Sequence, residues 1–193
     1  MKPDMDLVPT PSQTVGPFFK IELTTDEHCR PRIAGPKTKG ERAWITFRVL
    51  DGDGAPVDDA MLEIWQADSA GQYNHPDDPR PGTPEEGWIG FGRLQTAADG
   101  SSVLETIKPG AVRYDTVQAP HLTVAVFARG MLKQLYTRLY FAGDAANDTD
   151  PILSLVPADR RDTLMAKPDQ ARAGYWQFDL RLQGERETVF FDV

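Results

Sequence analysis

Residues 122–141 read LTVAVFARGMLKQLYTRLYF, and this stretch contains the two segments of the chain with the strongest β character. Residues 122–128 and 135–141 are rich in valine, leucine, phenylalanine and tyrosine. These residue types suit a pleated, half-buried surface. The stretch therefore predicts two β-strands and favours a fold that is built mainly from sheet.

Further strand-like segments lie on both sides of this stretch, and most of them alternate apolar with polar side chains. Such alternation places successive side chains on opposite faces of a strand. Turn signals separate the segments, among them the hairpin signal Asp99-Gly100. We expect these further strands at residues 43–50, 61–66, 90–96, 102–107, 175–182 and 188–191.

The remaining segments suggest an arm, a long loop and a single helix. Residues 1–40 are rich in proline and poorly suited to a ladder or a helix, so we expect an arm that lies across a surface or contacts a partner subunit. Residues 69–88 form a long polar loop of the kind that is often functional. Residues 158–166, after Pro157, predict the one short helix. The whole pattern predicts an all-β fold, an antiparallel β-sandwich with long connecting loops, over residues 41–193.

Composition excludes several classes of protein. The 193 residues fit a single domain, and no apolar run approaches the roughly 18 residues that span a bilayer. The formal net charge of -8 disfavours nucleic acid and anionic membranes as partners. Cys29 is the only cysteine, and the first residues lack the pattern of a signal peptide. We therefore expect a cytoplasmic protein.

The candidate metal ligands of this chain are its three histidines and one tyrosine, Tyr73. His28 lies in a charged loop and is interpreted as a surface residue, whereas Tyr73 precedes His75 and His121 opens a predicted strand. Imidazole and phenolate together are good donors for a ferric ion. The alternative is that Tyr73 packs against its loop and His121 ends a strand, and spacing alone favours this alternative.

Several short motifs follow one another over nearly the whole chain. They are residues 62–73 (LEIWQADSAGQY), 91–93 (FGR), 106–110 (TIKPG), 119–121 (APH), 139–141 (LYF) and 184–191 (GERETVFF). In identity and order they resemble the motifs of intradiol ring-cleavage dioxygenases. The resemblance implies a β-sandwich. It also implies an enzyme that holds a ferric ion through two tyrosines and two histidines, and inserts dioxygen into a catechol.

The family pattern of iron ligands is incomplete in this sequence. Tyr73 and His121 match two of the four ligands, but Val112 stands at the second tyrosine and Thr123 at the second histidine. Gln118 replaces an arginine that assists the substrate in the family. Valine offers no donor and threonine a poor one. The resemblance thus implies a vestigial site, with no metal and no catalytic residue in this chain.

Two other motifs point, within the family, to the non-catalytic α subunit of a two-chain enzyme. They are residues 10–18 (TPSQTVGPF) and 127–130 (FARG). The resemblance implies that a homologous β subunit holds Fe(3+), that αβ units form a higher oligomer, and that the substrates are O2 and protocatechuate, a catechol with a carboxylate. This chain would contribute to the pocket wall with Thr14, Gly16, Pro17, Phe18 and Arg129.

The chemistry of these residues permits such a role but leaves other roles open. Pro17 fixes the local backbone, Gly16 allows a close approach, and the Arg129 guanidinium suits a carboxylate. Arg129 has an alternative role in a surface or interfacial salt bridge, and Phe18 has one as an interface anchor.

Two further interpretations concern the whole chain. One is a self-sufficient, homomeric intradiol dioxygenase that uses Tyr73, Tyr114 and His121, with Tyr114 replacing the ligand missing at Val112. The other is a β-sandwich scaffold module without any catalytic role. Iron content and a co-purifying homologous chain distinguish these interpretations from the α-subunit hypothesis.

Overall fold

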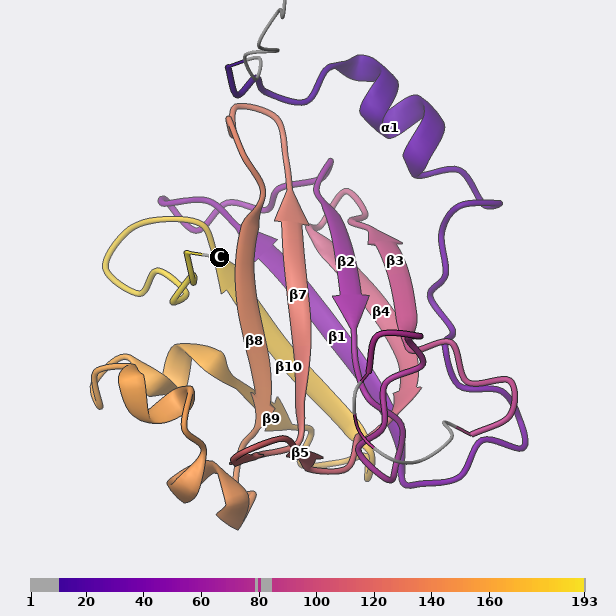
Figure 1. The fold of residues 1–193 in the computed structure, drawn as a ribbon. Helices are drawn as coiled ribbons and strands as arrows, with labels where there is room; N and C mark the ends of the chain where they lie inside the picture. Colours follow the sequence, from indigo (N-terminus) through magenta and orange to yellow (C-terminus); the bar gives the residue numbers. More distant parts are fainter. Residues whose placement is uncertain (1–10, 79, 81–84, 193) are drawn as a thin grey trace, which may run out of the picture.

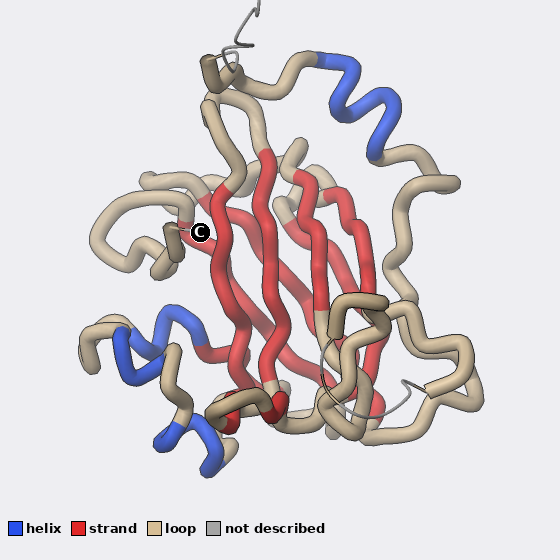
Figure 2. Tube along the Cα trace, viewed as in Figure 1, coloured by secondary structure: helices blue, strands red, loops and turns tan. Residues whose placement is uncertain are grey.

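The computed structural model of the chain describes residues 11–78, 80 and 85–192, and its regular elements are mostly strands (Figures 1 and 2). The described part contains the helix α1 (Pro17–Leu23) and the 3-10 helices η1 (Ala145–Thr149), η2 (Leu153–Leu155) and η3 (Arg161–Leu164). Its strands are β1 (Arg42–Leu50), β2 (Met61–Trp65), β3 (Phe91–Gln95), β4 (Ser101–Ile107), β5 (Val112–Arg113), β6 (Val117–Gln118), β7 (His121–Phe127), β8 (Leu135–Phe141), β9 (Met165–Pro168) and β10 (Tyr175–Arg181).

Eight of these strands form one nearly closed sheet in the order β3-β2-β7-β8-β9-β10-β1-β4, and β5 and β6 form a separate small ribbon. The expectation of a fold built from strands is confirmed. The expectation of purely antiparallel pairing is wrong, because β8 pairs in parallel with β9 and β1 with β10. Parallel neighbours need a long crossover connection, and the segment that carries η1 to η3 supplies it between β8 and β9.

The hydrophobic core lies between the two halves of the folded sheet, with β7 and β8 in front of β1 and β10 in Figure 1. Alternate residues of β1, such as Ile45 and Phe47, point into this core. On β7 the core residues are Leu122, Val124 and Val126. Because side chains alternate along a strand, His121 and Thr123 lie on the opposite, outer face.

Three local expectations are wrong. The proline-rich arm forms α1, which Pro17 starts at the first helical position, where its fixed φ is favourable. Residues 158–166 form the short η3 and the start of β9 instead of a longer helix. Met165 and Ala166 pair with Tyr140 and Phe141, and this tertiary pairing overrides helix propensity. Residues 188–191 contribute only the bridge between Phe191 and Tyr136.

The Asp99-Gly100 signal produces a turn but no hairpin. The Gly100 amide donates to the Ala97 carbonyl over 2.8 Å. Gly100 has a φ of +72°, and a Cβ there would stand 2.8 Å from the Val49 carbonyl oxygen, so glycine is required. The turn joins β3 and β4, which lie at the two ends of the strand order and do not pair with each other.

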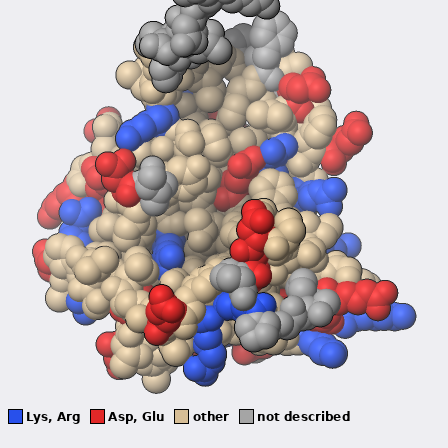
Figure 3. Space-filling view, viewed as in Figure 1, with Lys and Arg blue, Asp and Glu red and all other residues tan. Residues whose placement is uncertain are grey.

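The surface offers no support for a polyanionic partner on the face that Figure 3 shows. Lysine and arginine side chains there are interspersed with aspartate and glutamate and form no continuous basic patch. In the described part of the chain, no helix has the length and apolar character that crossing a membrane requires.

Candidate functional site

The residues predicted to be functional fall into two groups at opposite ends of β7. Tyr73, His121 and Thr123 belong to the start of the strand, whereas Arg129 follows its end. Six steps of about 3.3 Å separate His121 from Phe127, which is roughly 20 Å. The positions predicted to form a vestigial metal site and the predicted pocket residues therefore form two distinct surfaces.

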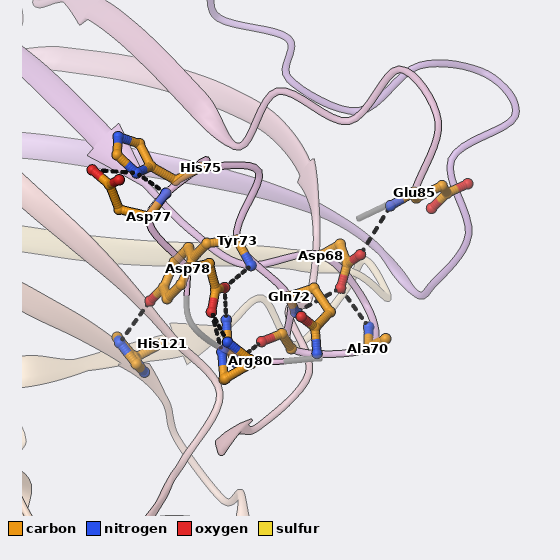
Figure 4. A network of polar contacts seen from close by, with 11 residues as sticks. Asp68, Ala70, Gln72, Tyr73, His75, Asp77, Asp78, Arg80, Glu85 and His121 are labelled. Atoms are coloured by element: carbon orange, nitrogen blue, oxygen red, sulfur yellow. Dashed lines mark hydrogen bonds and ion pairs between the residues drawn. The ribbon is translucent and has the colours of Figure 1, made fainter. Parts of the chain in front are cut away.

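His121 and Tyr73 are in contact at the first surface (Figure 4). The His121 Nδ1 lies 2.7 Å from the Ala119 carbonyl oxygen, so this nitrogen carries the proton and donates it. The other ring nitrogen, Nε2, then accepts from the Tyr73 hydroxyl over 3.4 Å, a long hydrogen bond. The Tyr73 ring also stacks on Trp65, with 5.9 Å between centroids and 7° between planes.

Burial keeps both of these side chains uncharged at neutral pH. Burial, followed by the positive charge of Arg138, lowers the pKa of His121 to about 4. Burial likewise raises the pKa of Tyr73 to about 12, against the attraction of Arg138. A neutral imidazole and a protonated phenol are therefore the resident species.

Thr123 lies on the outer face between Trp65 and Arg138, which are its neighbours in the β-ladders. The Arg138 guanidinium donates to Gln118 Oε1 over 2.9 Å and more weakly to the Tyr140 hydroxyl over 3.5 Å. Among the described residues, no carboxylate comes within ion-pair distance of Arg138. A cation without a carboxylate partner thus lies close to His121 and Thr123.

The residues present do not fit a ferric ion. Val112 is buried at 1% exposure and offers no donor atom, and Thr123 offers a neutral hydroxyl instead of an imidazole. In residues 11–78, 80 and 85–192, no group of three or more His, Cys, Asp or Glu side chains is placed to hold a metal. The charge of Arg138 beside His121 opposes a trivalent cation further.

Tyr114 lies in the same region as Tyr73, as the homomeric interpretation requires. The Arg80 guanidinium, however, lies over both rings, 5.4 Å from the Tyr73 centroid and 4.7 Å from the Tyr114 centroid. Arg80 forms a buried ion pair with Asp78, and hydrogen bonds from Arg80 lower the pKa of that carboxyl to about 2. Both tyrosine rings therefore lie against a guanidinium whose charge Asp78 balances.

The loop at residues 69–88 positions these groups, as its length suggested. Asp78 accepts the backbone N–H of Tyr73 over 3.1 Å, and Asp68 accepts the N–H groups of Ala70 and Gln72 (Figure 4). Sequence reasoning missed Arg80 and Arg138, because no spacing rule relates them to Tyr73 or His121.

The second surface joins the arm to the turn after β7. The Gly130 backbone N–H donates to the Thr14 hydroxyl over 2.9 Å, and the Phe19 ring lies 5.9 Å from that of Phe127. Arg129 Nε donates to Asp59, with side-chain exposures of 76% for Arg129 and 12% for Asp59. The surface ion pair weighed for Arg129 is therefore present, yet most of the guanidinium remains accessible.

The other predicted pocket residues lie in the same arm. Gly16 is exposed and precedes α1, and nothing would lie within 4 Å of a Cβ at this position. The backbone of Pro17 and Phe18 forms the start of α1. The side chains of Pro17 and Phe18 lie outside the part that the structure describes.

Protonation of His121 makes the stability of the fold depend on pH. The folded-state pKa, about 4, is below the unfolded value of about 6.5, so stability is complete above pH 6.5 and falls as the pH drops towards 4. We expect a loss of about 2 kcal/mol in the free energy of unfolding between pH 7 and pH 5. Urea unfolding at both pH values measures it.

His121→Asn removes the titrating group. It should therefore abolish most of the loss in unfolding free energy between pH 7 and pH 5. The matched control is His75→Asn at an exposed histidine, which should leave the pH dependence as it is. An equal pH dependence in His121→Asn and the unmodified chain would contradict the assignment to His121.

Comparison with known proteins places this chain in a protein family. The model of the Dioxygenase family matches residues 14–184. The chain is 44% identical to the protocatechuate 3,4-dioxygenase alpha chain of Burkholderia cepacia, over 95% of this chain and 97% of that one. It is 34% identical to the beta chain of the same enzyme from that organism, over 77% of this chain and 67% of the beta chain.

A solved structure gives the same result for the fold. The dioxygenase domain of a dioxygenase carbohydrate-binding fusion protein from Streptomyces sp. SirexAA-E has a TM-score of 0.64 and 29% identity. The similarity covers 92% of this chain and all of that domain.

Proposed function

This chain belongs to the intradiol ring-cleavage dioxygenase family, and from that premise we propose that it is the α subunit of a heteromeric protocatechuate 3,4-dioxygenase. The complex would cleave protocatechuate with O2 to 3-carboxy-cis,cis-muconate, with both oxygen atoms entering the product. A homologous β subunit would hold the ferric ion. The lone cysteine, Cys29, is consistent with a reducing, cytoplasmic location.

The observation that carries the proposal is the separation of the two surfaces along β7. Thr14 and Arg129 lie roughly 20 Å, a strand length, from the vestigial positions at His121 and Tyr73. Arg129 can therefore not serve a substrate bound at this chain's own metal positions. An exposed arginine next to an anchored arm is suited instead to completing a pocket on another subunit.

The chain's own residues would bind and orient the substrate. The exposed part of the Arg129 guanidinium would pair with the carboxylate of protocatechuate, and Asp59 would hold its Nε edge in place. Thr14, fixed to Gly130, would set the position of the arm, and Gly16 would allow the close approach of a partner's backbone. Pro17 and Phe18 would extend this wall.

The donor set supports placing the iron on the partner. Two of the four ligand positions lack a suitable donor, and Arg138 adds a repelling charge beside the remaining two. We therefore propose that Tyr73, Val112, His121 and Thr123 mark a vestigial site. When bound by the β subunit, the ferric ion would supply the redox chemistry, and this chain would supply only binding groups.

Co-expression with a homologous β chain tests the proposal. We expect a stable complex that has ring-cleavage activity and contains iron in proportion to the β chain. This chain purified alone should have no ring-cleavage activity. Iron near one per chain with activity in the absence of a partner would establish the homomeric alternative. Failure of any homologous chain to co-purify would favour a scaffold module.

The contact between Thr14 and Gly130 gives a smaller prediction. Thr14→Val removes the hydrogen-bond acceptor at nearly constant volume and should weaken assembly with the β chain by several-fold, since one such bond contributes about 1 kcal/mol. Sedimentation of mixed chains measures the association constant. The control Thr14→Ser keeps the hydroxyl and should assemble normally. If both variants assembled equally well with the β chain, the Thr14 hydroxyl would have no role in assembly.

A further inference from the structure

A polar hollow of about 170 Å³ lies on the outer face of β10. Phe178 and Leu180 of this strand belong to the core, so the alternate residues Gln177, Asp179 and Arg181 point outward. β10 lies behind β7 and β8 in Figure 1, on the other side of the core. Its outer face therefore points away from the outer face of β7, and the hollow is separate from the metal positions at the start of that strand.

The walls of the hollow come from three parts of the chain that hydrogen bonds hold together. β9 and β10 form its floor, η3 forms one wall and the segment after β10 forms the other. The Arg181 backbone N–H donates to the Thr188 hydroxyl over 3.0 Å, and the Thr188 N–H donates to the Arg181 carbonyl over 3.0 Å. The Val189 N–H donates to the hydroxyl of Thr163 in η3 over 3.3 Å. The hollow is thus a fixed feature of the fold.

The two aspartates of the hollow are each balanced by an arginine. The Arg48 guanidinium donates to both carboxylate oxygens of Asp179, over 2.8 and 2.5 Å. Arg186 donates to Asp162 over 2.5 Å across the hollow's edge. These paired carboxylates add little net charge to the hollow.

Lys167 and Arg181, by contrast, give the hollow two positive charges without a partner. In residues 11–78, 80 and 85–192, no carboxylate lies within ion-pair distance of either side chain. Gln177, which is opposite Lys167 in the ladder, adds a neutral amide donor. Ammonium and guanidinium groups donate hydrogen bonds but accept none, so the group that satisfies them must be an acceptor, and an anion above all.

The spacing of the two cations suits one small ion between them. Four strand steps, roughly 13 Å, separate the backbone of Gln177 from that of Arg181, and Lys167 lies beside Gln177. The long lysine and arginine side chains thus line the hollow from its two ends. We propose that this hollow binds a small doubly charged oxyanion of the phosphate class, held between Lys167 and Arg181 with Gln177 as a further donor.

This site goes beyond the proposed function, because it needs neither the partner nor the ferric ion. Its test is a calorimetric titration of the full chain with inorganic phosphate, and with nitrate as a singly charged comparator, at constant ionic strength. We expect phosphate to bind at least tenfold more tightly than nitrate. Equal affinities, or no saturable phosphate binding, would overturn the proposal and leave the α-subunit hypothesis untouched, since no ring-cleavage assay enters the test.

Variants assign the binding to the two cations. Lys167→Gln and Arg181→Gln should each weaken phosphate binding at least fivefold, and thermal unfolding checks that both variants are folded. The matched control is Lys37→Gln, which removes the same charge from an exposed lysine that does not line the hollow. It should bind phosphate as the unmodified chain does. An equal loss in Lys37→Gln, or unchanged affinity in folded Lys167→Gln and Arg181→Gln chains, would refute the assignment.

Discussion

Arg129→Ala, assembled with the β subunit, is expected to lower kcat/KM for protocatechuate by roughly 10- to 100-fold while leaving assembly largely intact. A charge-assisted hydrogen bond contributes about 1.5–3 kcal/mol, which corresponds to that range. The guanidinium is 76% exposed in the lone chain, so little packing is lost with it. Steady-state kinetics of the purified complex measure the effect.

Three comparisons separate substrate binding from a structural ion pair. Arg172→Ala removes another largely exposed arginine that is paired with a shielded aspartate, Asp169, and should leave kcat/KM unchanged. Asp59→Asn breaks the ion pair but keeps the guanidinium, and should cost far less than Arg129→Ala. Unsubstituted catechol, which lacks the carboxylate, should lose little in the Arg129→Ala complex. Equal losses in Asp59→Asn and Arg129→Ala would assign Arg129 to assembly or stability.

The charges around Tyr73 and His121 give a physical reason to expect poor binding of a ferric ion by this chain. Arg138 places a guanidinium without a carboxylate partner beside Tyr73 and His121, whereas the Arg80 guanidinium over the Tyr73 ring is balanced by Asp78. The surroundings of Tyr73 and His121 therefore favour neutral side chains over a bound cation.

Much of the fold could be predicted from local pattern. Residues 43–50 alternate strictly, and β1 buries the apolar set of that alternation. The alternation of side chains along a strand predicts that residues 121 and 123 share a face, and in β7 both lie on the outer face. The period of a strand suffices for such inferences, because it depends only on neighbouring residues.

The parts that could not be predicted depend on contacts between distant residues. The direction in which β9 lies beside β8 depends on how the long crossover returns, and no local motif encodes it. The ladder that aligns Thr123 with Arg138 depends in the same way on strand register. The motif comparison could identify missing ligands at Val112 and Thr123, but it could not show that a cation lies beside the positions that remain.

The absence of a ferric centre in the lone chain is the second large expected effect, and it is close to all-or-none. A site that retains Tyr73 and His121 alone has lost half of its donors, and Tyr73 must give up a proton whose pKa burial raises to about 12. The positive charge of the Arg138 guanidinium beside His121 further opposes the binding of a cation. We expect iron added during expression or refolding to be removed by dialysis.

The most direct test is metal analysis together with visible absorption of the purified chain in the absence of any partner. The account predicts far less than one iron per chain and a colourless solution, since no tyrosinate-to-iron charge transfer can occur. Iron near one per chain with a burgundy colour would contradict it, because this polypeptide would then hold the centre that we assign to its neighbour.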